Sequence, residues 1–254
     1  MKYKNEDSYI DCDGIKVHYK LDLPLEQKEG MPVLVLIPGF TGHIDEDHII
    51  AVGRAANEAG FAVLRAEMYG HGKSGGDFHE HNILLWMSEA SRVVRYAASL
   101  PFAGNIYLAG HSQGGLTAVL AGGVMADVIK ALIPLSPAMN IPYDARRGKM
   151  LEAPFDNDDL PDEIICPSWS LSSDYIRIAR VLPIDECIEM YKGPVLIVHG
   201  TDDADVPYRF GKELSERYEN ARLIPIEGDT HCYDLHLDQV ALAVKDFLIE
   251  QEGI

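Results

Sequence analysis

Short, almost uninterrupted apolar runs alternate with longer amphipathic stretches along most of the chain. Apolar runs of about six residues suit strands buried on both faces, whereas the longer stretches suit helices. The pattern predicts strands at 32–37, 61–66, 105–109, 130–135, 194–199 and 221–226. It predicts helices near 46–60, 82–100, 113–125, 208–219 and 233–251. Strands that alternate with helices imply an α/β fold with a mostly parallel central sheet and helices on both faces.

Two regions depart from this rhythm. Residues 8–23 read as an antiparallel hairpin around an Asp13-Gly14 turn. Residues 139–192 contain five prolines and an acidic cluster, and they join strand 130–135 to strand 194–199. A connection of this length within a compact domain is usually functional. We therefore expect one domain over residues 1–254 with a small inserted cap at 139–192.

The segment Gly110-His111-Ser112-Gln113-Gly114 lies between strand 105–109 and helix 113–125. Strand, Gly-x-Ser-x-Gly and helix in this order are typical of a nucleophile elbow, which exposes the serine hydroxyl on a sharp turn. The two glycines leave room where a side chain would collide with a neighbour. The alternative is a glycine-rich turn whose serine only caps the helix. We predict that Ser112 is a nucleophile.

A serine nucleophile needs a general base, and the base needs an acid that orients it. In chains with this elbow the order is serine, then aspartate or glutamate, then histidine. His231 lies in a polar loop after strand 221–226, where the base is expected. His236 is its nearest rival, but it falls inside the predicted last helix. We therefore predict His231 as the base.

Three aspartates follow strand 194–199 and compete for the role of the acid. Loops at the carboxyl ends of strands are where α/β folds place their chemistry. Asp203, the third residue after Gly200, has the spacing that suits this role. Asp202 and Asp205 are more naturally residues that cap the loop or the next helix. Asp203 is therefore the predicted acid.

Two backbone amides are expected to form an oxyanion hole. One is the N–H of Gln113, which follows the nucleophile. The other is the N–H of Phe40, in the loop that follows strand 32–37. Pro38 in that loop has no N–H and cannot serve. The alternative is that this loop is only a strand exit.

The composition of the chain limits the classes of partner that it is expected to bind. The chain has 40 acidic and 22 basic side chains and a formal charge of −18. Nucleic acids and anionic membrane surfaces are bound by basic patches, so neither is expected as a partner. Strongly anionic substrates are also disfavoured unless a local basic pocket overrides the mean charge.

The cysteines and the N-terminal segment indicate the compartment. Cys12, Cys166, Cys187 and Cys232 are scattered and show no metal-ligand spacing, so we expect no metal site and a reduced, cytoplasmic location. The N-terminal residues contain no apolar signal core, and no apolar run is long enough to cross a membrane. The sequence therefore predicts neither a secretion signal nor a transmembrane helix.

Taken together, the motifs resemble those of the α/β-hydrolase superfamily, and within it the bacterial cinnamoyl and feruloyl esterases. Members of that group usually carry histidine where this chain has Pro38. The Phe40 amide is retained, but the hydrogen bonding around its loop is left open. The matching segments, in the family's order, are residues 38–43, 68–74, 110–115, 132–137, 198–207 and 228–233.

The resemblance implies a serine ester hydrolase that forms an acyl-enzyme and uses neither a metal nor an organic cofactor. It implies a small-molecule ester with a hydroxycinnamoyl acyl group: feruloyl, p-coumaroyl or caffeoyl. The cap residues Asp144, Trp169 and Tyr175 would form an aromatic pocket with a polar end for a phenolic hydroxyl, or else serve cap packing or the surface. The oligomeric state is open, a homodimer included.

Three other functions stay open for this sequence. One is an esterase similar to monoacylglycerol or short-chain lipases, and another is a serine peptidase. The third is a non-catalytic binding protein on the same scaffold, against which the intact set of catalytic residues argues. A panel of esters with aromatic and aliphatic acyl groups would separate the first two from a hydroxycinnamate esterase.

Overall fold

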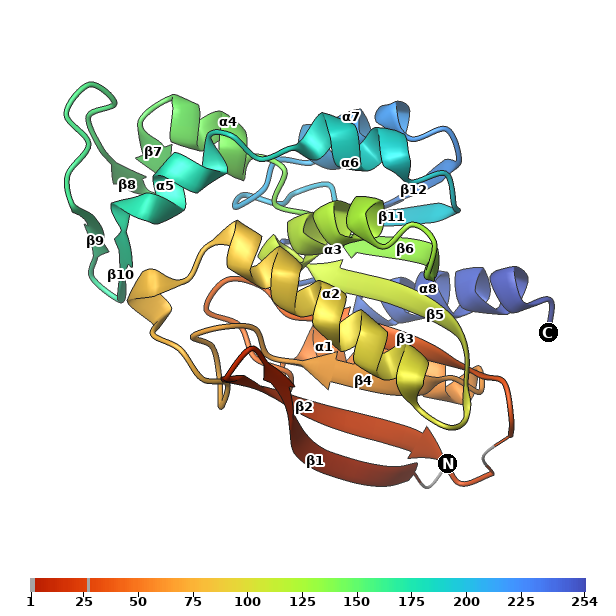
Figure 1. Cartoon of the computed structure of the whole chain (residues 1–254). Coiled ribbons are helices and arrows are strands. Elements are labelled where there is room, and N and C mark those ends of the chain that lie inside the picture. The colour runs from red at the N-terminus through yellow and green to blue at the C-terminus, as the bar shows by residue number, and fades with distance from the viewer. Residues whose placement is uncertain (1–2, 27) are drawn as a thin grey trace.

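Eight strands form the central sheet in the computed structural model, which describes residues 3–26 and 28–254. The strand order is β1-β2-β4-β3-β5-β6-β11-β12 (Figure 1). All pairs from β4 to β12 are parallel, which confirms the predicted parallel arrangement. The strands are β1 (Tyr3–Cys12), β2 (Ile15–Pro24), β3 (Met31–Ile37), β4 (Ala62–Ala66), β5 (Ala103–His111), β6 (Ile129–Leu135), β11 (Val195–Gly200) and β12 (Ala221–Ile226).

The predicted hairpin is confirmed as β1 and β2, which pair antiparallel over their whole length. Asp13 has φ 56° and Gly14 has φ 87°, so both turn residues adopt the left-handed conformation of a type I′ turn. β2 also pairs antiparallel with β4. This second pairing attaches the hairpin to the edge of the parallel strands.

The central strands are apolar on both faces because helices cover both faces. In β3, Val33 and Val35 belong to one core cluster, whereas Leu34 and Leu36 belong to the other. Successive strand residues point to opposite faces, so an uninterrupted apolar run fills both cores. The first cluster includes residues of α2 (Ile83–Ser99) and α3 (Gln113–Val124). The second includes residues of α1 (Asp47–Glu58) and α8 (Leu237–Glu252).

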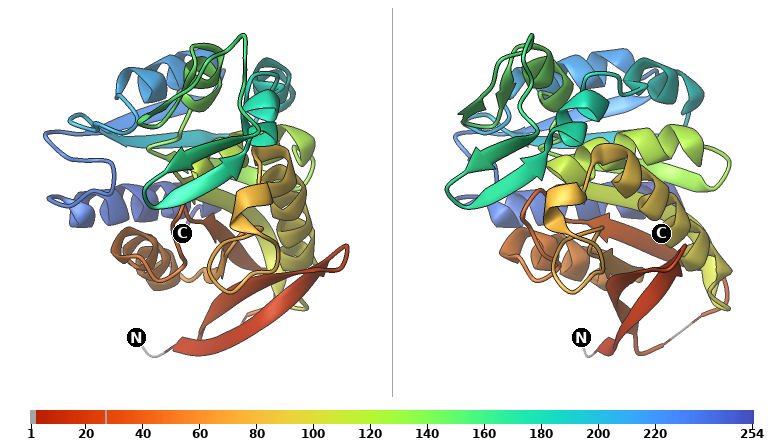
Figure 2. Two further views of the ribbon diagram at one scale, coloured as in Figure 1. Left: turned by 90° about the vertical axis from the view of Figure 1, so that its left-hand side faces the viewer. Right: turned by 60° about the vertical axis from the view of Figure 1, so that its left-hand side comes forward.

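Residues 139–192 leave the sheet at the end towards which the parallel strands point (Figure 1). They form short helices and two small antiparallel hairpins. In the left panel of Figure 2, these elements lie in front of the upper part of the sheet. α6 packs back onto α3, and β10 contacts the short helix η1 (Phe78–Glu80). The elements are α4 (Ile141–Arg146), β7 (Lys149–Met150), β8 (Ala153–Pro154), β9 (Glu163–Cys166), β10 (Trp169–Ser172), α5 (Ser173–Ala179) and α6 (Ile184–Met190).

The last helix begins later than its hydrophobic pattern predicts. α8 begins at Leu237 rather than at 233, and His236 is its N-cap, so the predicted position of His236 inside the helix is wrong. The cause is the fully buried side chain of Asp229, whose carboxylate accepts hydrogen bonds from the N–H groups of Leu235 (3.1 Å) and His236 (2.8 Å). These bonds hold the preceding residues in a loop. No helix of the described residues is long and apolar enough to cross a membrane.

Candidate active site

Ser112 lies in the turn between β5 and α3, with φ 55° and ψ −118°. Residues other than glycine rarely adopt this conformation. The turn is held by hydrogen bonds from the Ser112 N–H to the Leu135 carbonyl and from the Ala138 N–H to the Ser112 carbonyl, both 2.9 Å. A Cβ on Gly110 would lie 2.1 Å from the Gly114 carbonyl oxygen, and one on Gly114 would lie 2.4 Å from a carbonyl oxygen at the end of β3. Both glycines are therefore required by the packing of the turn.

His231 and Asp203 meet beyond the carboxyl ends of β12 and β11. These strands pair in parallel, so the loops that follow them reach the same edge of the sheet. His231 Nδ1 lies 2.7 Å from Asp203 Oδ2. The Asp203 side chain is fully buried, whereas Asp202 and Asp205 are exposed. Among the three aspartates of this loop, Asp203 is the one hydrogen-bonded to the imidazole.

The Asp203 carboxylate is surrounded by hydrogen-bond donors. His199 Nε2 lies 3.2 Å from Oδ2, and the N–H groups of Asp205 and Val206 donate to Oδ1 at 3.0 and 2.8 Å. Burial by itself raises the pKa of Asp203, but the hydrogen bonds from His199 and His231 outweigh it and lower that pKa below its ordinary value. The carboxylate therefore stays ionised beside the imidazole. Sequence reasoning missed His199, although it ends the apolar strand directly before this loop.

The same side chains also meet the spatial requirement of a metal site. Ligand atoms of Asp203, Asp205 and His231 all lie within 4.8 Å of one another. Two of the three are already hydrogen-bonded to each other, and a metal on His231 Nδ1 would replace that bond. The observed contacts therefore suit an acid and its base better than a cation.

Phe40 and Gln113, the predicted oxyanion residues, lie on two segments that meet at Ser112. Gln113 is the first residue of α3, so its N–H is at the positive end of that helix. Phe40 is in the loop after β3. A Cβ on Gly39 would lie 3.0 Å from the Ser112 Cβ, so this loop runs directly against Ser112.

A cavity of about 180 Å³ lies over the serine. Ser112, His231, Phe40 and Gln113 all line it, so four predicted site residues from three separate segments of the chain share one cavity. The inserted segment supplies another part of the wall, through Asn140, Ile141, Met150 and Leu151. A second cavity, of about 240 Å³ near α4, α6 and the following α7 (Arg209–Arg217), contains none of the predicted site residues.

Comparison with known proteins identifies the family. The family model described as "Serine aminopeptidase, S33" matches residues 29–176, which is more than half of the chain. The chain is a member of this α/β-hydrolase family. A model described as "TAP-like protein" matches residues 154–252.

Solved structures extend the likeness over almost the whole hydrolase. Est1E from Butyrivibrio proteoclasticus, in a structure with bound ferulic acid, is 48% identical with a TM-score of 0.94 and covers 97% of this chain and 99% of its own. A second Est1E structure is 46% identical with a TM-score of 0.91, over 98% and 99% of the two chains. The human protein ABHD12B is 26% identical over 88% of this chain, which spans 62% of the length of that relative.

Two of the three predicted cap residues contact Phe40 or Gln113, the predicted oxyanion residues. Tyr175 is completely buried, and its hydroxyl donates to Gln113 Oε1 at 2.7 Å. Trp169 is half-buried, and its ring meets the Phe40 ring edge-on with 5.3 Å between centroids. Neither side chain is part of the wall of the 180 Å³ cavity. The Tyr175 hydroxyl is therefore engaged by the protein, and a direct contact of either residue with substrate stays a prediction.

Asp144, the third predicted cap residue, is half-buried on α4. Its Oδ2 accepts a hydrogen bond from Asn140 Nδ2 at 3.0 Å. Asn140 lines the cavity, but Asp144 does not. Asp144 therefore reaches the cavity only through Asn140, whose amide it orients.

Sequence reasoning also missed His111, which supports the loop of the predicted base. Its Nε2 lies 2.9 Å from the His231 carbonyl oxygen, and because a carbonyl only accepts, Nε2 carries the proton. The centroids of the His111 and His231 rings are 4.7 Å apart. Burial lowers the pKa of His111, so its ring is neutral next to His231. The feature of the sequence that could have indicated this role is the position of His111 directly before Ser112 in the Gly-x-Ser-x-Gly motif.

Proposed function

We propose that this hydrolase is a serine esterase that cleaves hydroxycinnamate esters through an acyl-enzyme. The observation that carries the proposal is the 2.7 Å contact between His231 Nδ1 and Asp203 Oδ2, in a site where His231 and Ser112 line one cavity. A nucleophile, a base and an orienting acid are the three parts that acyl transfer requires. In this proposal Ser112, His231 and Asp203 are those parts.

The first half of the reaction acylates the enzyme. Ser112 Oγ attacks the ester carbonyl carbon while His231 Nε2 takes the hydroxyl proton. Asp203 keeps the Nδ1–H tautomer in place and stabilises the imidazolium that forms. The carbonyl oxygen becomes an oxyanion that accepts hydrogen bonds from the Phe40 and Gln113 N–H groups. The carbon–oxygen bond of the ester then breaks, and the alcohol leaves with the proton from His231.

The second half releases the acid. Water enters, gives its proton to His231 and attacks the acyl carbon, and the same two amides hold the second oxyanion. The bond to Ser112 breaks as the proton returns to its oxygen. Each donor of such an oxyanion hole typically contributes about 3 kcal/mol to the stability of the transition state. The cycle needs neither a metal nor an organic cofactor.

The hydroxycinnamoyl specificity draws support from two observations. Est1E, which is 48% identical to this chain, has been solved with ferulic acid bound. The Phe40 ring lies among the rings of Trp169, Tyr175 and Phe78, at centroid distances of 5.3, 6.4 and 5.3 Å. We propose that residues 139–192 act as a cap whose aromatic side chains select a flat aromatic acyl group.

A panel of esters tests this function. We expect kcat/KM to be higher for methyl ferulate, methyl p-coumarate and methyl caffeate than for methyl cinnamate, and lowest for butyrate and octanoate esters. Preference for the aliphatic esters would replace the hydroxycinnamate assignment with a lipase-like esterase.

Ser112→Ala is the control for the nucleophile. Loss of the hydroxyl removes the covalent route, and the kcat of comparable enzymes then falls by about 10⁶-fold. The variant should keep the wild-type circular dichroism and thermal midpoint. A folded Ser112→Ala protein with a near wild-type rate would exclude Ser112 as the nucleophile.

One observation favours a second candidate, an aminopeptidase. The matched family carries that description, and the exposed Asp205 carboxylate lines the cavity, where it could bind an α-ammonium group. Aminoacyl p-nitroanilides added to the panel distinguish the two activities. Faster turnover of these amides than of any ester, with Asp205→Asn raising KM for them, would establish the peptidase.

We also propose that the esterase acts on small molecules in a reducing, cytoplasmic setting, without nucleic acid or membrane partners. All four cysteines are free thiols, and the formal charge of −18 opposes anionic surfaces. Light scattering of the purified enzyme tests whether it forms a homodimer, which the sequence leaves open.

A further inference from the structure

The loop that carries Phe40 contains a strained turn. The Gly42 N–H donates to the Gly39 carbonyl at 3.1 Å, which closes a β-turn over Phe40 and Thr41. Thr41 has φ 58° at the third position of this turn, where type II geometry favours glycine. For a β-branched residue this conformation is a clear outlier, and it persists only when the surroundings hold it.

Both polar atoms of the peptide between Phe40 and Thr41 are hydrogen-bonded. The Thr41 N–H donates to His71 Nε2 at 3.2 Å, and the Thr41 hydroxyl donates to the Phe40 carbonyl at 2.6 Å. These two bonds fix the plane of that peptide. On the other side of Phe40, Gly39 is confined by its contact with Ser112. The direction of the Phe40 N–H is thus set by Gly39 on one side and by the Phe40–Thr41 peptide on the other. The position of that peptide depends on His71.

The His71 ring is held as a hydrogen-bond acceptor. Its Nδ1 lies 3.0 Å from the Tyr69 carbonyl oxygen, so Nδ1 carries the proton and Nε2 keeps its lone pair for Thr41. Burial lowers the pKa of His71 to about 4, which keeps the ring neutral at pH 7. The rings of Trp86 and Phe78 pack against it at centroid distances of 4.7 and 4.9 Å.

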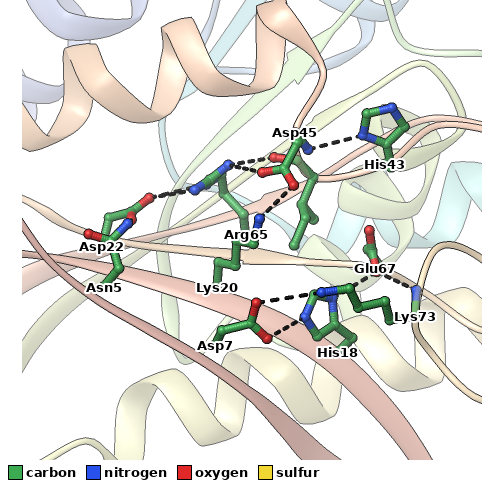
Figure 3. Close-up of polar contacts among 11 residues, drawn as sticks. Asn5, Asp7, His18, Lys20, Asp22, His43, Asp45, Arg65, Glu67 and Lys73 are labelled. Atoms are coloured by element: carbon green, nitrogen blue, oxygen red, sulfur yellow. Dashed lines mark hydrogen bonds and ion pairs between the residues drawn. The ribbon is translucent and has the colours of Figure 1, made fainter.

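The turn that presents His71 is itself tied to the sheet. Glu67 follows β4 and is buried, and its Oε2 accepts a hydrogen bond from the Lys73 N–H at 2.6 Å. The same oxygen lies 2.8 Å from His18 Nδ1, and His18 Nε2 lies 2.8 Å from Asp7 Oδ1 (Figure 3). These contacts join the turn to the N-terminal hairpin, so the turn that carries His71 is held rigidly.

The far end of the Phe40 loop is held by a separate group of residues. Arg65 donates to the Ile44 carbonyl at 2.5 Å, and it lies 3.3 Å from Asp45 Oδ1. Lys20 contacts the same aspartate, and Figure 3 shows dashed lines from Asp45 to both basic side chains. Removal of His71 should therefore leave residues 44 and 45 in place and affect only the Phe40–Thr41 peptide.

We propose that His71 is a positioning residue of the oxyanion hole, whose Nε2 holds the Phe40–Thr41 peptide so that the Phe40 N–H faces the Ser112 cavity. His71 does not line that cavity, so it acts through the backbone and not on the substrate. The inference rests on the proposed serine-esterase mechanism, because the oxyanion hole has a role only there.

Two substitutions separate the two nitrogen atoms of the ring. His71→Gln can place an amide oxygen where Nε2 accepts from Thr41. His71→Asn can keep a donor where Nδ1 contacts Tyr69, but its side chain is too short to reach the Thr41 N–H. The pair therefore differs in the one contact at issue, while both variants remove the imidazole ring and its packing.

The expected result is a loss of kcat with little change in KM, because the oxyanion forms only in the transition state. Deleting a whole oxyanion donor lowers kcat by about 10²- to 10³-fold, so misdirecting one should lower it by roughly 10- to 100-fold in His71→Asn. His71→Gln should lie within about 5-fold of the wild type. Equal kcat losses in the two variants, or a loss in KM alone, would overturn the proposal.

A spectroscopic measurement tests the hydrogen bond from the Thr41 N–H to His71 Nε2 without an activity assay. Long-range ¹⁵N–¹H spectra of the ¹⁵N-histidine-labelled protein should show His71 as the Nδ1–H tautomer, assigned by comparison with His71→Gln. The Nε2–H tautomer would contradict the bond to Thr41. If the wild type hydrolyses no ester of the panel, the proposed function fails, while the tautomer still decides the contact. If His71→Asn does not fold, a more than 10-fold loss in kcat for folded His71→Gln overturns the proposal, and a smaller loss supports it.

Discussion

The two sides of Ser112 differ in their chemistry. On the side of His231, the proposed base, the Asp203 carboxylate is buried and ionised, with hydrogen-bond donors on both oxygens. On the side of the proposed oxyanion hole, the Phe40 ring packs against other aromatic rings and against neutral histidines. There, burial lowers the pKa of His71 to about 4 and that of His81 to about 3.

The contrast follows from the charges that the proposed reaction creates. A positive imidazolium forms on one side, and a buried carboxylate stabilises it. A negative oxyanion forms on the other, where backbone dipoles in a water-poor environment stabilise it strongly and neutral rings add no competing charge. The charged group nearest the reacting atoms therefore lies beside His231, and the rings around Phe40 are free to provide aromatic walls.

Removing the buried charge should have the largest effect on this contrast. Asp203→Asn should lower kcat by about 10⁴-fold, because an amide holds the imidazole in the wrong tautomer. Asp202→Asn is the matched control, and its exposed side chain should change kcat by less than about 3-fold, as expected of a surface substitution. Steady-state kinetics on one hydroxycinnamate ester measures both. A greater loss in Asp202→Asn would move the acid role to that residue.

The neutral histidines should make the fold sensitive to acid. Their folded pKa values lie below the reference value of about 6.5, so the unfolded chain binds more protons between about pH 4 and 6.5. Their contribution is complete above pH 6.5 and is lost as the pH falls towards the folded pKa. At pH 5 each of His71 and His81 should lower the free energy of unfolding by about 2 kcal/mol.

Urea unfolding at pH 7.5 and pH 5 measures this dependence. His81→Asn retains a donor for the Phe78 carbonyl that His81 Nδ1 contacts, and it removes the titrating ring. Its stability should be lower at pH 7.5 but should fall less between the two pH values. A fall as large as that of the wild type would mean that His81 does not remain neutral in the folded protein.

The aromatic half should select substrates and leave the chemical step alone. Trp169→Ala removes a ring that packs edge-on against Phe40, so the pocket should lose contact area for a flat acyl group. We expect kcat/KM to fall by about 10-fold for ferulate and cinnamate esters, and by much less for butyrate. Equal losses on all three esters would assign Trp169 to the stability of the cap.

Tyr175→Phe should have the smallest effect. If the hydroxyl binds the phenol, as the sequence predicts, only the 4-hydroxycinnamate ester should lose activity. The contact with Gln113 predicts instead a loss of about 5-fold, shared by all esters, because one buried hydrogen bond contributes about 1 kcal/mol. Kinetics on 4-hydroxycinnamate, cinnamate and butyrate esters distinguishes the two interpretations.

Most of the fold could be predicted because its signals are local. An apolar run such as residues 32–37 can be buried on both faces only inside a covered sheet, and its alternation with amphipathic stretches gives the order of elements. Gly110 and Gly114 mark the elbow, since each faces a backbone oxygen that excludes a Cβ. The start of α8 could not be predicted, because the buried Asp229 carboxylate caps the loop before it.

The sequence by itself determined the order of the elements, the serine turn and the candidates for the base and the acid, because these depend on neighbours along the chain. The tertiary structure decided which side chains meet: His71 with Thr41 across 30 residues, and Tyr175 with Gln113 across 62. No local pattern encodes such contacts. They arise where the packing of a sheet and its insertion buries a donor and an acceptor together, and burial without a partner would be unfavourable.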